Sequence, residues 1–274
     1  MQKKKGPRKK TNEPLHGKEK RSKKGPSLRK KAPASDSLIR LNKYIANSGL
    51  CSRRDADDFI ARGYISVNGS IVREMGFKVH PQDDVRYKGK RIAPEKRVYI
   101  LMNKPKDLIT TSDDPHGRKT VFSFFRPPLD VRVYPVGRLD RMTTGVLLFT
   151  NDGQLTKQLT HPGYNKKKIY QVATDKPVTR NDLEKIAQGI TLEDGFIAAD
   201  AIHYLNPDDK TMIGIEIHSG RNRIIRRIFE FLGYDVIKLD RVYFAGLTKK
   251  GLARGKWRYL SDKEISILKR GSYD

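Results

Sequence analysis

Apolar residues first recur at a regular spacing after a long polar leader. Leu41 and Ile45 stand four positions apart, which predicts a short amphipathic helix. Ser52 followed three residues later by Asp55 is a capping-box pattern and starts a second helix. Residues 65–72 alternate apolar and polar positions around an Asn-Gly pair, which is a strong β-hairpin signal. This stretch therefore predicts a small unit of two helices and a small sheet.

Longer apolar segments follow from residue 98 onward. The most apolar of them, 146–149, ends at an Asn-Asp-Gly turn and predicts a buried strand. Further strands are predicted at 99–102, 131–136, 169–173 and 211–218, a short apolar segment at 121–125, and helices at 154–159, 182–188 and 223–232. Because strands and helices do not alternate in a strict βαβ order, we expect an α+β fold with a mixed, largely antiparallel sheet flanked by helices.

The net charge of the chain indicates which class of partner it binds. Its 57 Lys and Arg residues against 31 Asp and Glu give a net charge of +26, which is typical of a nucleic-acid-binding protein. A basic protein that binds membranes or polyanions without specificity is the alternative. No apolar run is long enough to span a membrane, and the start of the chain lacks the apolar core of a signal peptide. We expect a cytoplasmic protein that contacts no membrane, and the single cysteine excludes an intrachain disulfide.

The first 37 residues contain 14 Lys and Arg residues but three acidic ones, and no aromatic residue, Ile or Val. Such a segment buries too little apolar surface to offset its ordering entropy, so we expect a disordered basic tail that contacts phosphates. A solubilising leader or a targeting address remains an alternative. The expected organisation is a tail at 1–37, a small domain at 38–97 and a larger domain at 98–274.

Common cofactor motifs are missing. The sequence has neither a GxGxxG nor a GxxxxGK[ST] pattern, and its six histidines lack metal-ligand spacing. We therefore expect neither a cofactor nor a metal.

One carboxylate stands out against this basic background. Asp140 lies in a Gly-flanked loop between Arg138 and Arg141, directly before the buried strand 146–149. The strand anchors the loop, and the loop presents the carboxylate to a cationic surface. An ordinary turn or capping residue is the default interpretation of a single Asp.

The stretch 137–153 closely resembles the signature loop of the RsuA/RluB-type ribosomal RNA pseudouridine synthases. Three further segments resemble that family and follow in its order: the HPG motif with the strand at 161–172, the SGRNRIIRRIF helix at 219–229, and the GKWRYL strand at 255–260. The resemblance covers nearly everything but the tail.

Roles for five residues are implied by this resemblance. Asp140 is the nucleophile, which attacks either the uracil ring or the ribose carbon. Tyr170 packs on the target base and takes or relays the proton that the base loses, while Ile225 lines the pocket. Arg226 pairs with Asp140, and Arg138 enters the RNA stack where the target uridine leaves it.

Physical chemistry supports the implied roles. A carboxylate is a nucleophile when it is ionised and aimed, and a nearby arginine favours the ionised form. A stacked base is out of reach, so it must be flipped out at about a few kcal/mol, of which aromatic stacking returns about 1–3 kcal/mol. Two alternatives stay open, because Tyr170 is also compatible with an ordinary core position and Arg226 with a surface pair to Glu230 four residues on.

The small unit at 38–97 resembles the S4 RNA-binding domain. The segments that carry this resemblance are RLNKYI at 40–45, SRRDA at 52–56 and VNG at 67–69. Arg53 and Arg54 open the second helix, where the helix dipole disfavours cations, which suggests an external anion. We expect RNA contacts from these two residues and from Arg40 and Lys43; the alternative is a solvated helix end.

The sequence thus predicts an enzyme that isomerises a specific uridine to pseudouridine in ribosomal RNA without a cofactor. Overall similarity to the RluB branch favours the large-subunit (23S) RNA over a 16S target. The competing hypothesis is a non-catalytic RNA-binding or ribosome-assembly protein on the same fold. We expect ribosomal RNA and ribosome-assembly intermediates as partners of a monomer, and we assign no role to Met142.

Overall fold

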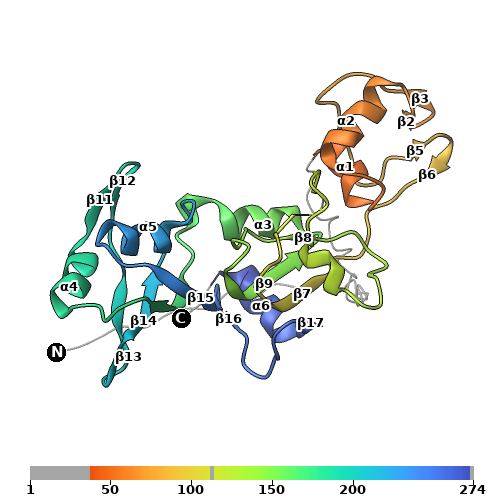
Figure 1. Ribbon diagram of the computed structural model, residues 1–274. Coiled ribbons are helices and arrows are strands. Elements are labelled where there is room, and N and C mark those ends of the chain that lie inside the picture. Colours follow the sequence, from red (N-terminus) through yellow and green to blue (C-terminus); the bar gives the residue numbers. More distant parts are fainter. Residues whose placement is uncertain (1–37, 112–113, 272–274) are drawn as a thin grey trace, which may run out of the picture. The chain divides into compact units, whose positions relative to one another are not determined.

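The computed structural model describes residues 38–111 and 114–271 (Figure 1). The predicted tail at 1–37 lies outside the described residues. No helix in the described ranges is long and apolar enough to cross a membrane.

Two short helices and short strands make up residues 39–91. Their bounds are β1 Ile39–Arg40, α1 Leu41–Asn47, α2 Arg53–Ala61, β2 Ile65–Val67, β3 Ser70–Ile71, β4 Lys78–Val79, β5 Val85–Tyr87 and β6 Lys90–Arg91. Four strands form a sheet in the order β3-β2-β5-β6, while β1 pairs with β4. Apolar side chains of both helices and of β2, β4 and β5 form one core.

Local sequence signals of this unit are confirmed. The hydroxyl of Ser52 accepts a hydrogen bond from the Asp55 N–H at 3.2 Å, and the Asp55 carboxylate accepts one from the Ser52 N–H at 3.0 Å. Asn68 and Gly69 both adopt positive φ, 51° and 87°, at the turn between β2 and β3. Asn-Gly tolerates this left-handed conformation, which explains why the hairpin turns there.

Residues 98–271 form the larger region. Its strands are β7 Tyr99–Lys104, β8 Tyr134–Pro135, β9 Thr144–Thr150, β10 Lys168–Thr174, β11 Ile190–Leu192, β12 Gly195–Ile197, β13 Ala201–Asn206, β14 Asp209–Ile217, β15 Val236–Phe244, β16 Leu247–Thr248 and β17 Trp257–Tyr259. Its helices are α3 Gly153–Thr160, α4 Arg180–Gln188, α5 Ile224–Phe231 and α6 Asp262–Arg270, with short 3-10 turns at Val121–Phe124 and Pro162–Tyr164.

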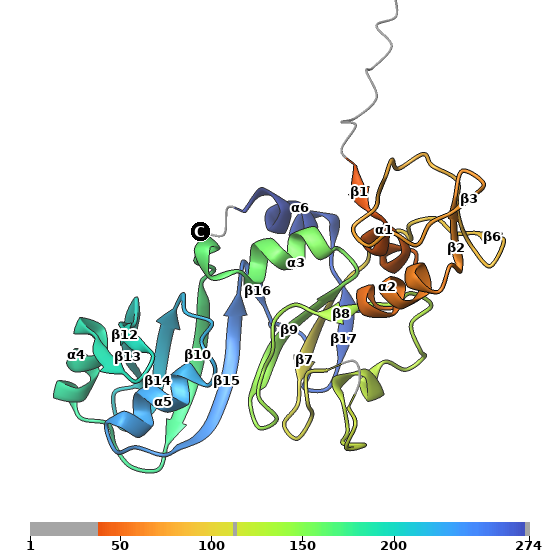
Figure 2. The same cartoon turned by 90° about the horizontal axis from the view of Figure 1, so that it is seen from above.

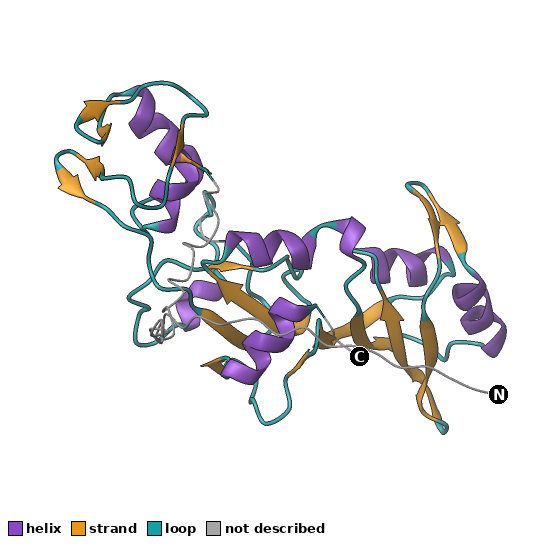
Figure 3. Cartoon of the chain, turned by 180° about the vertical axis from the view of Figure 1, so that it is seen from behind, coloured by secondary structure: helices purple, strands orange, loops and turns teal. Residues whose placement is uncertain are grey.

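The main sheet of this region runs in the order β13-β14-β10-β15-β9-β7-β17, with β16 beside β15 and β8 beside β9. Among these described strands the β9–β15 pair is parallel, and the other pairs are antiparallel. Helices flank the band of strands (Figure 3). The expected α+β fold with a largely antiparallel sheet is confirmed.

Alternate residues of the buried strand β9 belong to two separate apolar cores. Leu147 and Phe149 of β9 join the core that contains α4 and α5, while Val146 and Leu148 join the core that contains α3 and α6. Figure 2 shows α3 and α6 lying next to each other along one side of the strands. A strand buried on both faces reads as a continuous apolar run, which is why 146–149 was visible in the sequence.

Several expectations need correction. The strand expected at 131–136 is shorter, since only Tyr134–Pro135 (β8) is a strand; the apolar segment at 121–125, for which no element was predicted, contains the 3-10 turn Val121–Phe124. Strand β15, which lies between β10 and β9, was not predicted, nor were the β11–β12 hairpin, β13 and α6. Polar residues interrupt the alternation in β15: Asp240 pairs with Lys249 and Arg254, and Arg241 donates to the Val146 carbonyl of β9.

The β9–β15 junction places the start of β9 in the centre of the sheet. Only Thr144 and Gly145 of β9 pair with β15, at Asp240 and Arg241. A Cβ on Gly145 would lie 2.1 Å from the Arg241 carbonyl oxygen, and its φ is 106°. Glycine is therefore required for the two backbones to meet, and the loop that enters β9 is held at this junction.

Candidate active site

The loop before β9 folds into a tight turn that carries Asp140. The N–H of Thr143 donates to the carbonyl of Asp140 at 3.1 Å, so residues 140–143 reverse the chain. Arg141 is fixed on the outside by an ion pair with Asp107 at 2.6 Å. The Asp140 side chain remains partly exposed.

A buried lysine holds this turn from beneath. Lys104, the last residue of β7, is 0% exposed, and its Nζ donates to the carbonyls of Asp140, Arg141 and Thr143 at 3.1, 3.1 and 2.8 Å. A fourth bond reaches the Pro105 carbonyl at 3.2 Å. The ammonium thus adds a second donor to the Asp140 and Arg141 carbonyls, which also accept from the N–H groups of Thr143 and Asp107, and it ties the whole turn to the end of β7.

Burial lowers the pKa of Lys104 to about 8, and the negative charges of Asp140 and Asp107 act in the opposite direction. Sequence reasoning missed this residue. The available signal was a lysine that ends an otherwise apolar strand, because a charged group at such a position needs several partners.

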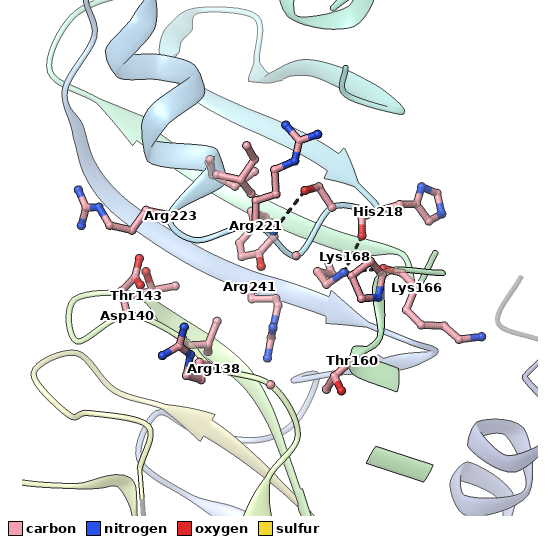
Figure 4. A pocket seen from close by; sticks show the side chains of 18 of the residues that line it. Arg138, Asp140, Thr143, Thr160, Lys166, Lys168, His218, Arg221, Arg223 and Arg241 are labelled. Carbon is pink, nitrogen blue, oxygen red and sulfur yellow. Dashed lines mark hydrogen bonds between the residues drawn. The ribbon is translucent and has the colours of Figure 1, made fainter. Parts of the chain in front are cut away.

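Asp140 lies at the edge of a pocket of about 150 Å³ (Figure 4). Its apolar wall contains Tyr170 of β10, Ile225 of α5 and Leu239 of β15, which are 9%, 2% and 5% exposed. The structure therefore brings together four of the predicted site residues, Arg138, Asp140, Tyr170 and Ile225. Tyr170 also belongs to the apolar core, so its core position and its place in the pocket are compatible.

The rest of the pocket wall is cationic. Among the residues that the structure describes, Asp140 is the one acidic side chain lining it, whereas the basic side chains and histidines are Arg138, His161, Lys166, Lys168, His218, Arg221, Arg223 and Arg241. Figure 4 shows several of these gathered from different strands and loops around one opening. This distribution suits a polyanionic ligand with one reactive carboxylate among its contacts.

Two of these cations are unusually buried. The Nζ of Lys168 donates to the carbonyls of Lys166 and His218, and burial, reinforced by Arg241, lowers the pKa of Lys168 to about 8. Arg241 is 3% exposed, its Nε donates to the Val146 carbonyl at 2.9 Å, and its Nη2 has no hydrogen-bond acceptor among the residues that the structure describes. Neither residue was singled out from the sequence: Lys168 begins the predicted strand β10 but was given no role, and Arg241 lies in β15, which was not predicted.

Arg226 differs from the expectation. Within residues 38–111 and 114–271 no ion pair joins it to Asp140; its Nη1 donates instead to the Val236 carbonyl at 2.7 Å. Burial lowers the pKa of Arg226, and the repulsion from Arg223 adds to this, while Asp140 opposes it. Asp140 and Arg226 line a common hollow, so they interact through charge without direct contact.

The alternative pairing of Arg226 with Glu230 is also absent from the described contacts, because Glu230 pairs with Arg223 at 3.3 Å. Arg227, the next residue, points to the β11–β12 turn and makes a two-pronged ion pair with Asp194 at 2.7 and 2.8 Å. Arg226 and Arg227 therefore serve different surroundings.

The remaining predicted residues are placed as follows. Arg138 is exposed and lines the pocket beside Asp140. Arg40 precedes α1, Lys43 lies on α1, and Arg53 and Arg54 form the exposed first turn of α2. In the described ranges no group of three or more His, Cys, Asp or Glu side chains is arranged to hold a metal ion.

Comparisons with known proteins show the family of the chain. A family model for RNA pseudouridylate synthase matches residues 98–231, and an S4 domain model matches residues 39–85. "Ribosomal large subunit pseudouridine synthase B" of Bacillus subtilis (strain 168) is 40% identical over 235 residues, which are 85% of this chain and 96% of that protein. "Dual-specificity RNA pseudouridine synthase RluF" of Escherichia coli (strain K12) is 35% identical over 85% of this chain and 79% of its own.

A solved structure agrees as well. A crystal structure described as a pseudouridylate synthase superposes with a TM-score of 0.61 at 29% identity, covering 84% of this chain and 99% of the other. The fold, the matched regions and the relatives define a class: an S4 domain followed by an RNA-modifying enzyme domain. The chain belongs to the family of RNA pseudouridylate synthases, as its sequence predicted.

Proposed function

We propose that this protein converts a specific uridine of ribosomal RNA to pseudouridine, with Asp140 as the nucleophile. The observation that carries the proposal is the turn 140–143, which Lys104 holds from beneath so that Asp140 faces a pocket with Tyr170 and Ile225. A rigid carboxylate beside an aromatic and an aliphatic wall suits a flipped pyrimidine base.

The reaction is an isomerisation, so atoms and electrons balance within the substrate. The Asp140 carboxylate adds either to the uracil ring or to C1′ of the ribose, and the C1′–N1 bond breaks. The base then turns, a C1′–C5 bond forms, and Asp140 leaves. C5 loses a proton and N1 gains one. No net oxidation or reduction occurs.

Residues of the pocket have distinct tasks in this scheme. Tyr170 supplies a ring against which the extruded base packs, and its hydroxyl is placed to relay the proton lost from C5. Ile225 and Leu239 exclude water from the base. Arg226 attracts the Asp140 carboxylate through charge across the hollow that both residues line, and Arg138 occupies the gap that the uridine leaves in the RNA stack.

Positive charge provides the affinity for RNA. The cations around the pocket meet the phosphates near the target, and Arg40, Lys43, Arg53 and Arg54 of the S4 domain hold a second part of the RNA. The large-subunit RNA is the favoured target, because a relative with 40% identity is named for that subunit. We place the enzyme in the cytoplasm, acting as a monomer on ribosomal RNA or its assembly intermediates.

Purified protein incubated with 23S and 16S transcripts labelled with tritium at uracil C5 tests the proposal, since pseudouridine formation releases the label. We expect release from the 23S transcript. Asp140→Asn should abolish it while the RNA Kd stays within about twofold, because the change removes the charge but keeps the shape. Near-normal turnover by Asp140→Asn would refute the assigned mechanism. Tight RNA binding by the wild-type protein without release from either transcript would favour the non-catalytic assembly factor.

A further inference from the structure

Two large apolar side chains are exposed next to the catalytic turn. Met142 is 53% exposed and Ile237 is 61% exposed, and neither belongs to any of the three apolar cores. Both line a hollow of about 400 Å³ that also contains Asp140. Neither side chain packs into a core, and because both line one hollow beside Asp140 they offer a joint apolar surface to a ligand there.

Met142 is presented on a rigid support. It occupies the turn closed by the hydrogen bond from the Thr143 N–H to the Asp140 carbonyl. The carbonyls of Arg141 and Thr143, on either side of it, are both bound by Lys104. The side chain therefore stands two residues from the nucleophile, on backbone that is fixed by the same buried ammonium.

Ile237 lines the same hollow from strand β15. It is the second residue of β15, directly after Val236, whose carbonyl accepts the 2.7 Å hydrogen bond from Arg226. That bond ties the start of β15 to helix α5. Met142 and Ile237 thus come from separate elements, each anchored by a buried or partly buried cation, and they share one hollow.

Guanidinium groups surround these two side chains. Arg141, Arg223 and Arg226 line the same hollow, and the side chains of the first two are 57% and 47% exposed. A hollow lined by both apolar side chains and guanidinium groups matches a nucleotide, whose base has an apolar face and whose phosphate is an anion. The hollow adjoins the pocket at Asp140, so the nucleotide that fits it is one beside the target.

We propose that Met142 and Ile237 form a clamp for the base that flanks the target uridine in the RNA chain. Extrusion of the uridine exposes a face of its neighbour, and the two apolar side chains cover that face. The clamp thereby contributes to the choice of the modified position. This inference rests on the proposed function.

The first test measures kcat/KM for Met142→Ala and Ile237→Ala on the same tritium-labelled transcripts. Removal of the side chain that covers the base should lower kcat/KM by between about fivefold and a hundredfold. Thermal unfolding should be unchanged, because neither side chain is buried. Phe231→Ala is the control: Phe231 is 58% exposed at the end of α5 but does not line this hollow, and its removal should leave kcat/KM unchanged.

The decisive test removes the flanking base instead of the side chains. A stem-loop that carries the mapped uridine is made with an abasic ribose on its 5′ or its 3′ side. One of these substrates should lower kcat/KM of the wild-type enzyme but cause no further reduction in the Met142→Ala/Ile237→Ala double variant, since that variant no longer covers the base.

Three outcomes overturn the clamp. Alanine variants with wild-type kcat/KM exclude it directly. Additive reductions from the abasic and alanine changes would mean that these side chains touch something else, such as a protein partner. No turnover by the wild-type enzyme on either transcript would overturn the proposed function and the clamp together, which distinguishes that failure from the first two.

Discussion

Replacing Lys104 with methionine should disturb the position of the catalytic turn 140–143 while leaving the Asp140 side chain itself unchanged. Methionine is similar in length and removes the ammonium that donates to four carbonyls. Hydrogen bonds from a charged group contribute about 1.5–3 kcal/mol each. Against this, methionine avoids the desolvation of the ammonium, about 3 kcal/mol for the pKa that falls from 10.5 to about 8. Even at about 1.5 kcal/mol each, the four hydrogen bonds outweigh the desolvation, and we expect a net destabilisation of about 3 kcal/mol or more.

The kcat of Lys104→Met should fall by more than the loss of folded protein can explain. Residues 140–143 lose their common anchor, and a displacement of about 1 Å at the reacting group lowers kcat roughly a hundredfold. The assays are urea unfolding followed by circular dichroism, and tritium release under conditions where the variant is folded. Lys106→Met is the matched control, since Lys106 is exposed two residues away and should change neither quantity.

The lowered pKa of Lys104 gives this prediction a pH signature. Between pH 8 and 10.5 the unfolded chain binds more protons at this lysine than the folded one, so the stability of the wild type relative to Lys104→Met should rise with pH by up to about 3 kcal/mol. A folded Lys104→Met enzyme with wild-type kcat would refute the idea that the ammonium positions Asp140.

Three other perturbations follow from the structure. Arg226→Ala should lower kcat about tenfold or more and change the RNA Kd less than about twofold, because the Arg226 guanidinium acts on Asp140 by charge. The control Arg227→Ala, which removes the ion pair with Asp194, should leave kcat unchanged; if both variants lowered kcat equally, Arg226 would be a phosphate-binding residue instead. The two-pronged hydrogen bond from Arg258 lowers the pKa of Glu264 from 4.5 to about 2, so this ion pair contributes roughly 1–2 kcal/mol of stability above pH 4.5, which is lost as the pH falls towards 2. Acid unfolding of Glu264→Gln and the wild type checks this, and a stability difference that does not change between pH 4.5 and pH 2 would contradict it. Removing residues 1–37 should reduce the log–log salt slope of RNA binding by about 0.7–0.9 for each phosphate that the tail neutralises in the full-length protein, whereas an unchanged slope would identify the tail as an address or leader.

Local signals in the sequence were sufficient for much of the fold. The Ser52–Asp55 capping box, the Asn68-Gly69 turn and the buried run 146–149 each depend on neighbours within a few residues, and each appears where it was expected. Such features are decided by backbone conformation and short-range hydrogen bonds, which are properties of the segment itself. Asp140, Tyr170 and Ile225 were found through motifs, and they share the pocket.

Only the tertiary structure decided what surrounds the carboxylate. Lys104 is 36 residues from Asp140 in sequence, and it reaches the turn because β7 lies beside β9. Arg241 donates to the Val146 carbonyl because β15 pairs in parallel with β9, and no local sequence pattern predicts this pairing. The same packing sets the Arg226 guanidinium against the Val236 carbonyl rather than against Asp140. The partner of a charged side chain depends on which strands and helices lie next to each other. Packing between segments far apart in the sequence decides this.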